Sequence, residues 1–186
     1  YLPLVEVTSP AATWAFVLVL SVMLMAIPWL PPRAKPEPKA TVDLTNCNGC
    51  ERCESDCPYN AIQMWARSDG LPFEREARVD PRLCVGCGIC AGSCPTATPF
   101  RRRSSLVPGI DIADRSVADL RDQVDAVKLA GDGRVMVFAC DHGAIPEEDE
   151  ATGTVTIPCA GALPPSFIDY TLSRNVADGV MLAGCA

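Results

Sequence analysis

The longest feature in the hydrophobic pattern lies near the start of the chain. Residues 11–30 read AATWAFVLVLSVMLMAIPWL and contain no charged side chain. A run of about 20 apolar residues is long enough to cross the hydrocarbon layer as a helix. Trp14 and Trp29 lie near its two ends, where aromatic side chains meet the membrane surface. The pattern predicts a transmembrane helix within a membrane segment at residues 1–31. A signal peptide and a buried core helix are the alternatives.

The last part of the chain alternates short apolar runs with amphipathic stretches. Apolar positions at helical spacing predict a helix from Ser116 to Ala130 and a second one at residues 164–176. Short apolar runs predict buried strands at residues 134–140, 154–159 and 179–185. Because strands separated by helices are typical of a parallel, doubly wound sheet, we expect an α/β domain at residues 104–186.

Between these regions the sequence repeats one spacing of cysteines. Residues 47–58 and 84–95 both follow the pattern Cys-x2-Cys-x2-Cys-x3-Cys-Pro, which accounts for eight of the eleven cysteines. Three thiolates at this spacing bind one cubane iron–sulfur cluster, and the fourth, before proline, binds the other cluster. Zinc also binds Cys-x2-Cys pairs, but it requires neither the third cysteine nor the Cys-Pro step. A disulfide framework does not account for the exact repeat. Short strands are expected just before each run.

Residues 41–99 resemble the bacterial two-cluster ferredoxin family, because both four-cysteine signatures and both prolines are present. The resemblance implies an α+β ferredoxin-like domain, at residues 41–103, that carries two [4Fe–4S] clusters and transfers electrons. It implies that one cluster is held by Cys47, Cys50, Cys53 and Cys94, and the other by Cys84, Cys87, Cys90 and Cys57. Residues 64–76 are longer than the hairpin of a minimal ferredoxin, and residues 67–72 are expected to form an exposed, inert surface loop, with a docking element as the alternative.

The remaining three cysteines follow the three predicted strands, at Cys140, Cys159 and Cys185. Since the carboxyl ends of parallel strands meet at one edge of a sheet, these thiols are expected to converge; three buried structural cysteines are the alternative. Residues 134–186 resemble the delta (iron–sulfur) subunit of methyl-viologen-reducing hydrogenases. The resemblance implies a [2Fe–2S] cluster on these three residues. The sequence departs from that family at Gly143, where a second cysteine is expected, and His142 is a weaker candidate ligand.

The charged residues on either side of the apolar stretch predict the orientation of the chain in the membrane. Basic residues follow the apolar stretch, at Arg33, Lys35 and Lys39, whereas only Glu6 precedes it. The positive-inside rule then places the clusters on the cytoplasmic side of the cell membrane, where thiols also stay reduced. The proline-rich residues 32–40 are expected to form a stiff linker.

The functional expectation is an electron-transfer component of an oxidoreductase complex rather than a stand-alone enzyme. A net charge of −7 argues against nucleic acid as a partner. The apolar stretch contains no histidine, so a quinone-linked or cytochrome b membrane subunit would supply any haem. A cytoplasmic, hydrogenase- or heterodisulfide-reductase-like oxidoreductase would be the other partner. An iron–sulfur redox sensor or scaffold is the alternative. We also expect the chain to be part of a longer protein, such as a fusion with a preceding cytochrome b, with its last domain truncated.

Overall fold

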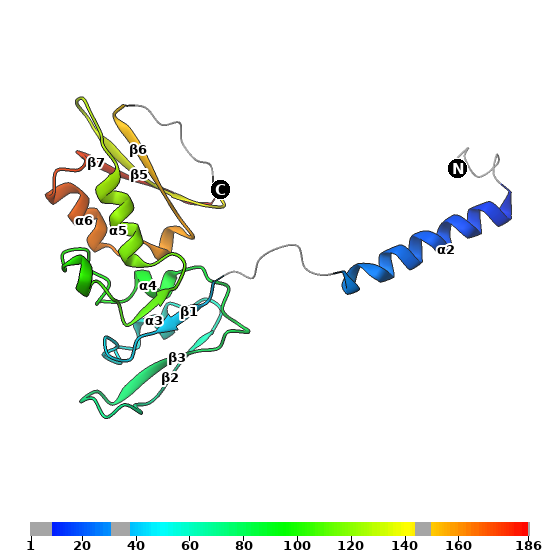
Figure 1. Ribbon diagram of the computed structural model, residues 1–186, viewed down its shortest axis with the longest axis horizontal. Helices are drawn as coiled ribbons and strands as arrows, with labels where there is room; N and C mark the ends of the chain where they lie inside the picture. Colours follow the sequence, from blue (N-terminus) through cyan, green and yellow to red (C-terminus); the bar gives the residue numbers. More distant parts are fainter. Residues whose placement is uncertain (1–8, 31–37, 144–149, 186) are drawn as a thin grey trace. The chain divides into compact units, whose positions relative to one another are not determined.

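The computed structural model describes residues 9–30, 38–143 and 150–185, and it is an α+β structure. The chain divides into two compact units, residues 1–36 and residues 37–186. Most of the predicted linker at residues 32–40 lies outside the described residues. Figure 1 shows the elements of both units, which are described separately here.

The first unit contains one apolar helix. Helix α2 (Pro10–Ala26) continues as a 3₁₀ turn, η1 (Ile27–Trp29), where Pro28 ends the regular hydrogen bonding. Ser9 caps its first turn, since its hydroxyl oxygen accepts a hydrogen bond from the Ala12 N–H at 3.3 Å. None of its side chains is buried, although they are apolar on every side. The 20 residues Pro10–Trp29 have the length and composition of a membrane span, and a signal sequence has the same properties.

Two small antiparallel sheets frame the cysteine runs in the second unit. Strands β2 (Ile62–Ala66) and β3 (Arg75–Val79) form a hairpin. Strand β1 (Ala40–Val42) pairs with β4 (Ile110–Ile112), with Thr41 opposite Asp111. Strand β4 lies beyond residue 103 and was not predicted. The chain after the second cysteine run therefore returns to the strand that precedes the first run. A 3₁₀ turn, η2 (Arg103–Ser105), lies on this return path.

The rest of the second unit is a three-stranded parallel sheet with helices, as predicted. Strands β5 (Val135–Cys140), β6 (Thr152–Ile157) and β7 (Gly179–Ala183) lie in the order β6–β5–β7. Helices α5 (Val117–Ala126) and α6 (Ser166–Ser173) lie together against this sheet in Figure 1. A hydrogen bond of 2.8 Å from the Tyr170 hydroxyl to Asp125 joins the two helices. Their core includes Phe138 and Phe167, which are fully buried.

Helix α5 begins where the sequence predicts but ends earlier. The Ser116 hydroxyl oxygen accepts a hydrogen bond from the Asp119 N–H, and the Asp119 carboxylate accepts one from the Ser116 N–H, which forms a capping box. The helix was predicted to reach Ala130, but it ends at Ala126, and Val127 already has a β-type backbone conformation. Beyond the helix, the Val127 and Leu129 side chains pack on β6, where they occupy the space that a side chain at Gly153 would need.

Candidate metal centres

The described cysteines of the two runs line two cavities. One cavity is lined by Cys47, Cys50, Cys53 and Cys94. The other is lined by Cys57, Cys84, Cys87 and Cys90. Each cavity therefore receives three thiols from one run and the fourth from the other run. We call these cavities the first and the second cluster site.

The backbone of the two cysteine loops repeats the same unusual conformation. In the first loop Gly49 and Glu51, on either side of Cys50, have φ of 67° and 66°. In the second loop Gly86 and Gly88, on either side of Cys87, have φ of 73° and 80°. Left-handed residues within a loop turn successive N–H groups inward and create concave sites for anions, iron–sulfur clusters among them. Glu51 adopts this conformation at a cost that glycine does not incur.

A short helix follows each loop and buries the third cysteine of each run. Helix α3 (Arg52–Ser55) carries Cys53, and α4 (Ile89–Gly92) carries Cys90. Both thiols are buried, and burial raises the pKa of each to about 12. A free thiol here would stay protonated at neutral pH, so positive charge from iron is needed to hold both groups as thiolates.

Hydrogen bonds reach the fourth cysteine of each run. The Thr96 hydroxyl lies 3.0 Å from the Cys94 sulfur and accepts a hydrogen bond of 2.8 Å from the Gly109 N–H. Its own proton is then free to point at Cys94. In the second site the Ala61 N–H donates to the Cys57 sulfur at 3.4 Å. Donors to cluster sulfur stabilise the reduced cluster and raise its potential.

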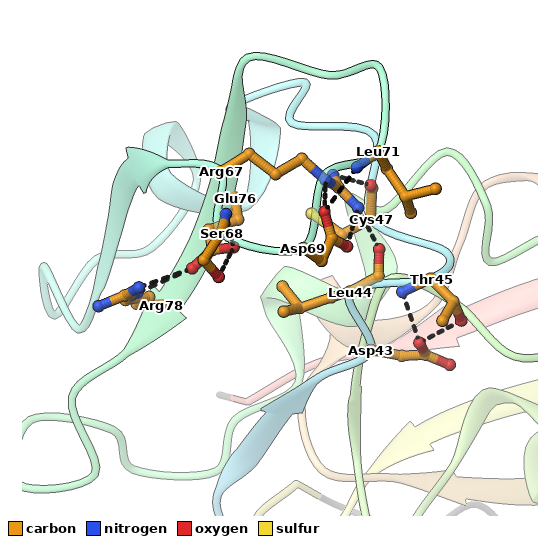
Figure 2. A network of polar contacts seen from close by, with 10 residues as sticks. All are labelled: Asp43, Leu44, Thr45, Cys47, Arg67, Ser68, Asp69, Leu71, Glu76 and Arg78. Atoms are coloured by element: carbon orange, nitrogen blue, oxygen red, sulfur yellow. Dashed lines mark hydrogen bonds and ion pairs between the residues drawn. The ribbon is translucent and has the colours of Figure 1, made fainter.

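The hairpin connection, expected to be an inert surface loop, contacts the first cluster loop (Figure 2). The Arg67 side chain is only 3% exposed and forms an ion pair with Asp69, with an Nε–Oδ1 distance of 2.5 Å. It also donates hydrogen bonds to the carbonyl oxygens of Cys47 and Leu44. Residues 68–75 are exposed, as expected of a surface loop, but the segment is not inert, because the buried Arg67 side chain binds the first cluster loop.

The family comparison identifies the region that contains both sites. Residues 32–98 match the family model described as a 4Fe-4S dicluster domain. This region of the chain is a 4Fe-4S dicluster domain. The domain implies two [4Fe–4S] clusters and electron transfer, and its eight cysteines are consistent with both. No curated protein and no solved structure matches the chain. No comparison identifies the region after residue 98.

The dicluster domain fits its cofactors in donor chemistry. Each site offers four sulfur donors, a loop with left-handed residues on either side of a cysteine, and partly apolar walls. Among the described residues, no three Cys, His, Asp or Glu side chains are placed to hold a single metal ion. Each thiolate of a cubane binds a different iron, so its ligand set is wider than that of one ion. The four thiols of each site would hold the cluster, which supplies one-electron chemistry.

Beyond the dicluster domain, the three remaining cysteines lie together, as expected from their strand-end positions. Cys140, Cys159 and Cys185 line one cavity, which His142 also borders. The sulfur atoms of Cys140 and Cys185 are 3.2 Å apart, and this contact is the first cause that raises the pKa of Cys185. Cys140 is buried and Cys185 is exposed. Asp141, in the same cavity wall, forms an ion pair with Arg115.

Proposed function

We propose that the chain is a membrane-anchored electron-transfer subunit. It relays electrons between a quinone- or cytochrome b-linked membrane partner and a cytoplasmic oxidoreductase of the hydrogenase or heterodisulfide-reductase type. The observation that carries the proposal is the juxtaposition, in one chain, of a dicluster domain and an exposed apolar helix of 20 residues. A helix without a polar face is unfavourable in water on every side, whereas the hydrocarbon layer of a bilayer accommodates it.

In this proposal the first site holds one cubane on Cys47, Cys50, Cys53 and Cys94, and the second holds the other on Cys57, Cys84, Cys87 and Cys90. The convergence of four thiols on each cavity supports these sets. The basic residues Arg33, Lys35 and Lys39 after the apolar helix support a cytoplasmic position for the clusters in this proposal.

A third iron–sulfur centre, a [2Fe–2S] cluster, is proposed at Cys140, Cys159 and Cys185. In a tetrahedral site with metal–sulfur bonds of about 2.3 Å, two thiolates lie roughly 3.8 Å apart. The Cys140–Cys185 distance of 3.2 Å is close to this spacing, so these two thiols suit one iron of a two-iron cluster. Cys159, on the same cavity, suits the second iron.

The second cubane would stand between the first cubane and the third centre. Cys87 lines both the second cluster site and the cavity of the third centre, together with Tyr59, Val85 and Gly86. The pKa of Cys87 is raised, mainly by burial, and the charge of Cys159 contributes to the rise. These contacts support a relay with the second cubane in the middle.

Membranes that contain the chain test the relay and its anchoring together. The clusters should be reduced by a quinol or by a cytoplasmic donor, and reoxidised, on the timescale of turnover. The chain should stay with the membrane after an alkaline wash, which removes peripheral proteins. Clusters that do not turn over, or a chain that is released with the wash, would contradict the proposal. Retention of Pro10–Trp29 in the mature chain, read by mass spectrometry, separates an anchor from a cleaved signal sequence.

Iron and sulfide analysis of the purified chain tests the third centre. Two cubanes alone give about eight irons per chain, whereas an added two-iron centre gives about ten. Cys159→Ser should remove only the additional iron and leave both cubane EPR signals unchanged. A count near eight in the unmodified chain would exclude the third centre and leave the two cubanes in place.

A further inference from the structure

Both cluster sites share one feature that the cysteine motif does not contain. The first cysteine of each run has its carbonyl oxygen bonded to a cationic side chain. Arg67 Nη1 donates to the Cys47 oxygen at 2.6 Å, and Lys39 Nζ donates to the Cys84 oxygen at 2.6 Å. Cys47 and Cys84 occupy the same position in the two repeats.

The two cations reach these equivalent carbonyls from unrelated parts of the fold. Arg67 follows β2 in the hairpin, 20 residues after Cys47. Lys39 immediately precedes β1, 45 residues before Cys84. The internal repeat of the ferredoxin fold therefore does not generate the pair, because Arg67 and Lys39 are not at equivalent positions. Two independent elements each supply a cationic donor to the same carbonyl position, one in each site.

The surroundings hold each cation in its position. The Arg67 side chain is 3% exposed, donates a second bond to the Leu44 carbonyl, and lies 5.2 Å from the centre of the Phe73 ring. Lys39 is half-buried. In both loops the N–H of the same cysteine is also fixed, by bonds of 2.9 Å from Cys47 to Asp43 and 3.0 Å from Cys84 to Asp80.

We propose that Arg67 and Lys39 each tune the reduction potential of one cluster, Arg67 the first and Lys39 the second. Reduction adds one negative charge to a cluster, and a nearby cation stabilises that charge. The attraction is strong where water is excluded, because the local dielectric constant is low. Each cation also polarises the peptide of a ligand cysteine and holds the loop in place, so both residues are positioning residues. The proposal rests on the ligand sets proposed above.

The ion pair of Arg67 gives the proposal an internal check of sign. Asp69 accepts two bonds from the guanidinium, at 2.5 and 2.8 Å, and offsets part of its charge. Removal of the Asp69 charge should therefore move the potential of the first cluster in the opposite direction to removal of the Arg67 charge. A role limited to folding would not produce shifts of opposite sign.

The test is an EPR-monitored redox titration of the purified chain with both cubanes assembled. Cys50→Ser and Cys87→Ser, which alter one proposed ligand set each, assign the signals. Arg67→Gln should shift only the first cluster to a lower potential, and Lys39→Gln should shift only the second. Asp69→Asn should raise the potential of the first. Arg78→Gln is the matched control, because Arg78 is a hairpin arginine that is 52% exposed and pairs with Glu76.

Arg67→Lys keeps the positive charge, so the reduction potential of its first cluster should stay close to that of the unmodified chain. This variant keeps the test possible if Arg67→Gln fails to fold. The inference is overturned if Arg67→Gln and Lys39→Gln, with their iron content intact, leave both potentials unchanged or shift both clusters equally. An iron count or EPR spectrum that shows fewer than two cubanes in the unmodified chain would instead overturn the proposed ligand sets. The two failures are therefore distinguishable.

Discussion

A single methyl group added at Gly92 should weaken the packing between the dicluster domain and the α/β region. Gly92 is the last residue of α4, and it packs against the 3₁₀ turn η3 (Ala160–Ala162) that follows β6. A β-carbon at Gly92 would lie 2.3 Å from the Gly161 carbonyl oxygen and 3.0 Å from the Ala162 carbonyl carbon. Both contacts are backbone atoms, so no side-chain rotation relieves the overlap.

The size of the effect follows from these distances. Cβ contacts below 3.0 Å are essentially never seen, so α4 and η3 must move apart by about 0.7 Å in Gly92→Ala. Overpacking costs about 1–3 kcal/mol, and an overlap with two backbone atoms belongs to the upper part of this range, about 2–3 kcal/mol. Alanine regains up to about 1 kcal/mol through its higher helix propensity. We expect a net loss of about 1–2 kcal/mol in the free energy of unfolding. With a urea m-value of about 2 kcal/mol/M, the midpoint falls by about 0.5–1 M.

Urea unfolding, followed by far-UV circular dichroism and by the visible absorbance of the clusters, measures this change. Gly179→Ala is the matched control, because the nearest atom to its β-carbon is Val135 Cγ2 at 4.0 Å. Alanine there should be neutral or stabilising by about 0.4–1 kcal/mol, since it restricts the unfolded chain. The reasoning is refuted if Gly92→Ala matches the unmodified chain in midpoint, or if the control loses as much stability.

Three further changes test single contacts. Cys94→Ser should abolish the EPR signal of the first cluster, although Cys94 lies in the second run, because its thiol lines the first site; loss of the second cluster instead would contradict the crossed ligand sets. Thr96→Val removes the donor to the Cys94 sulfur and should lower the potential of the first cluster alone in a redox titration. Burial raises the pKa of Asp111 to about 6, so the folded state favours its neutral form. The stability that this carboxyl contributes is present below about pH 4, the unfolded value, and is lost as the pH rises through 6. Asp111→Asn does not titrate, so its free energy of unfolding relative to that of the unmodified chain should rise by up to about 2 kcal/mol from pH 4 to pH 7. This figure is reduced for the partial exposure of the carboxyl group. Urea unfolding of both chains at each pH measures the change.

The sequence predicts those parts of the molecule in which the pattern is local. Cysteine spacing within a run is set by one loop and one helical turn, so both runs are recognisable without knowledge of their surroundings. Strand β5 is a continuous apolar run, as is typical of a strand buried on both faces, and all of its residues except Val135 are buried. The convergence of Cys140, Cys159 and Cys185 follows from the same reasoning, since parallel strands place their ends at one edge.

Contacts between distant segments were not predictable from such patterns. Strand β4 is only three residues long, and its pairing with β1 joins residues about 70 positions apart. The sequence around Arg67 is charged and contains Gly70 and Pro72, which is typical of an exposed turn. The burial of the Arg67 side chain depends on where the hairpin folds back, and the β2–β3 register decides this position rather than local composition. The chain after α5 likewise depends on a distant residue, because Val127 and Leu129 pack over Gly153 of β6.

The segment after the second cysteine run belongs physically to the first cluster site. A β-carbon at Gly109 would lie 2.8 Å from the Cys47 α-carbon, and the Gly109 N–H fixes the Thr96 hydroxyl that faces Cys94. Strand β4 begins at the next residue and binds this segment to β1. Asp111 within β4 accepts hydrogen bonds from the Val117 N–H at the start of α5. One continuous stretch thus lines the first site, completes the sheet of the dicluster domain and starts the α/β region. A change that loosens this stretch reaches the first site through two contacts at once, at Cys47 and at Thr96, so the dicluster domain and the α/β region are coupled through residues 109–117.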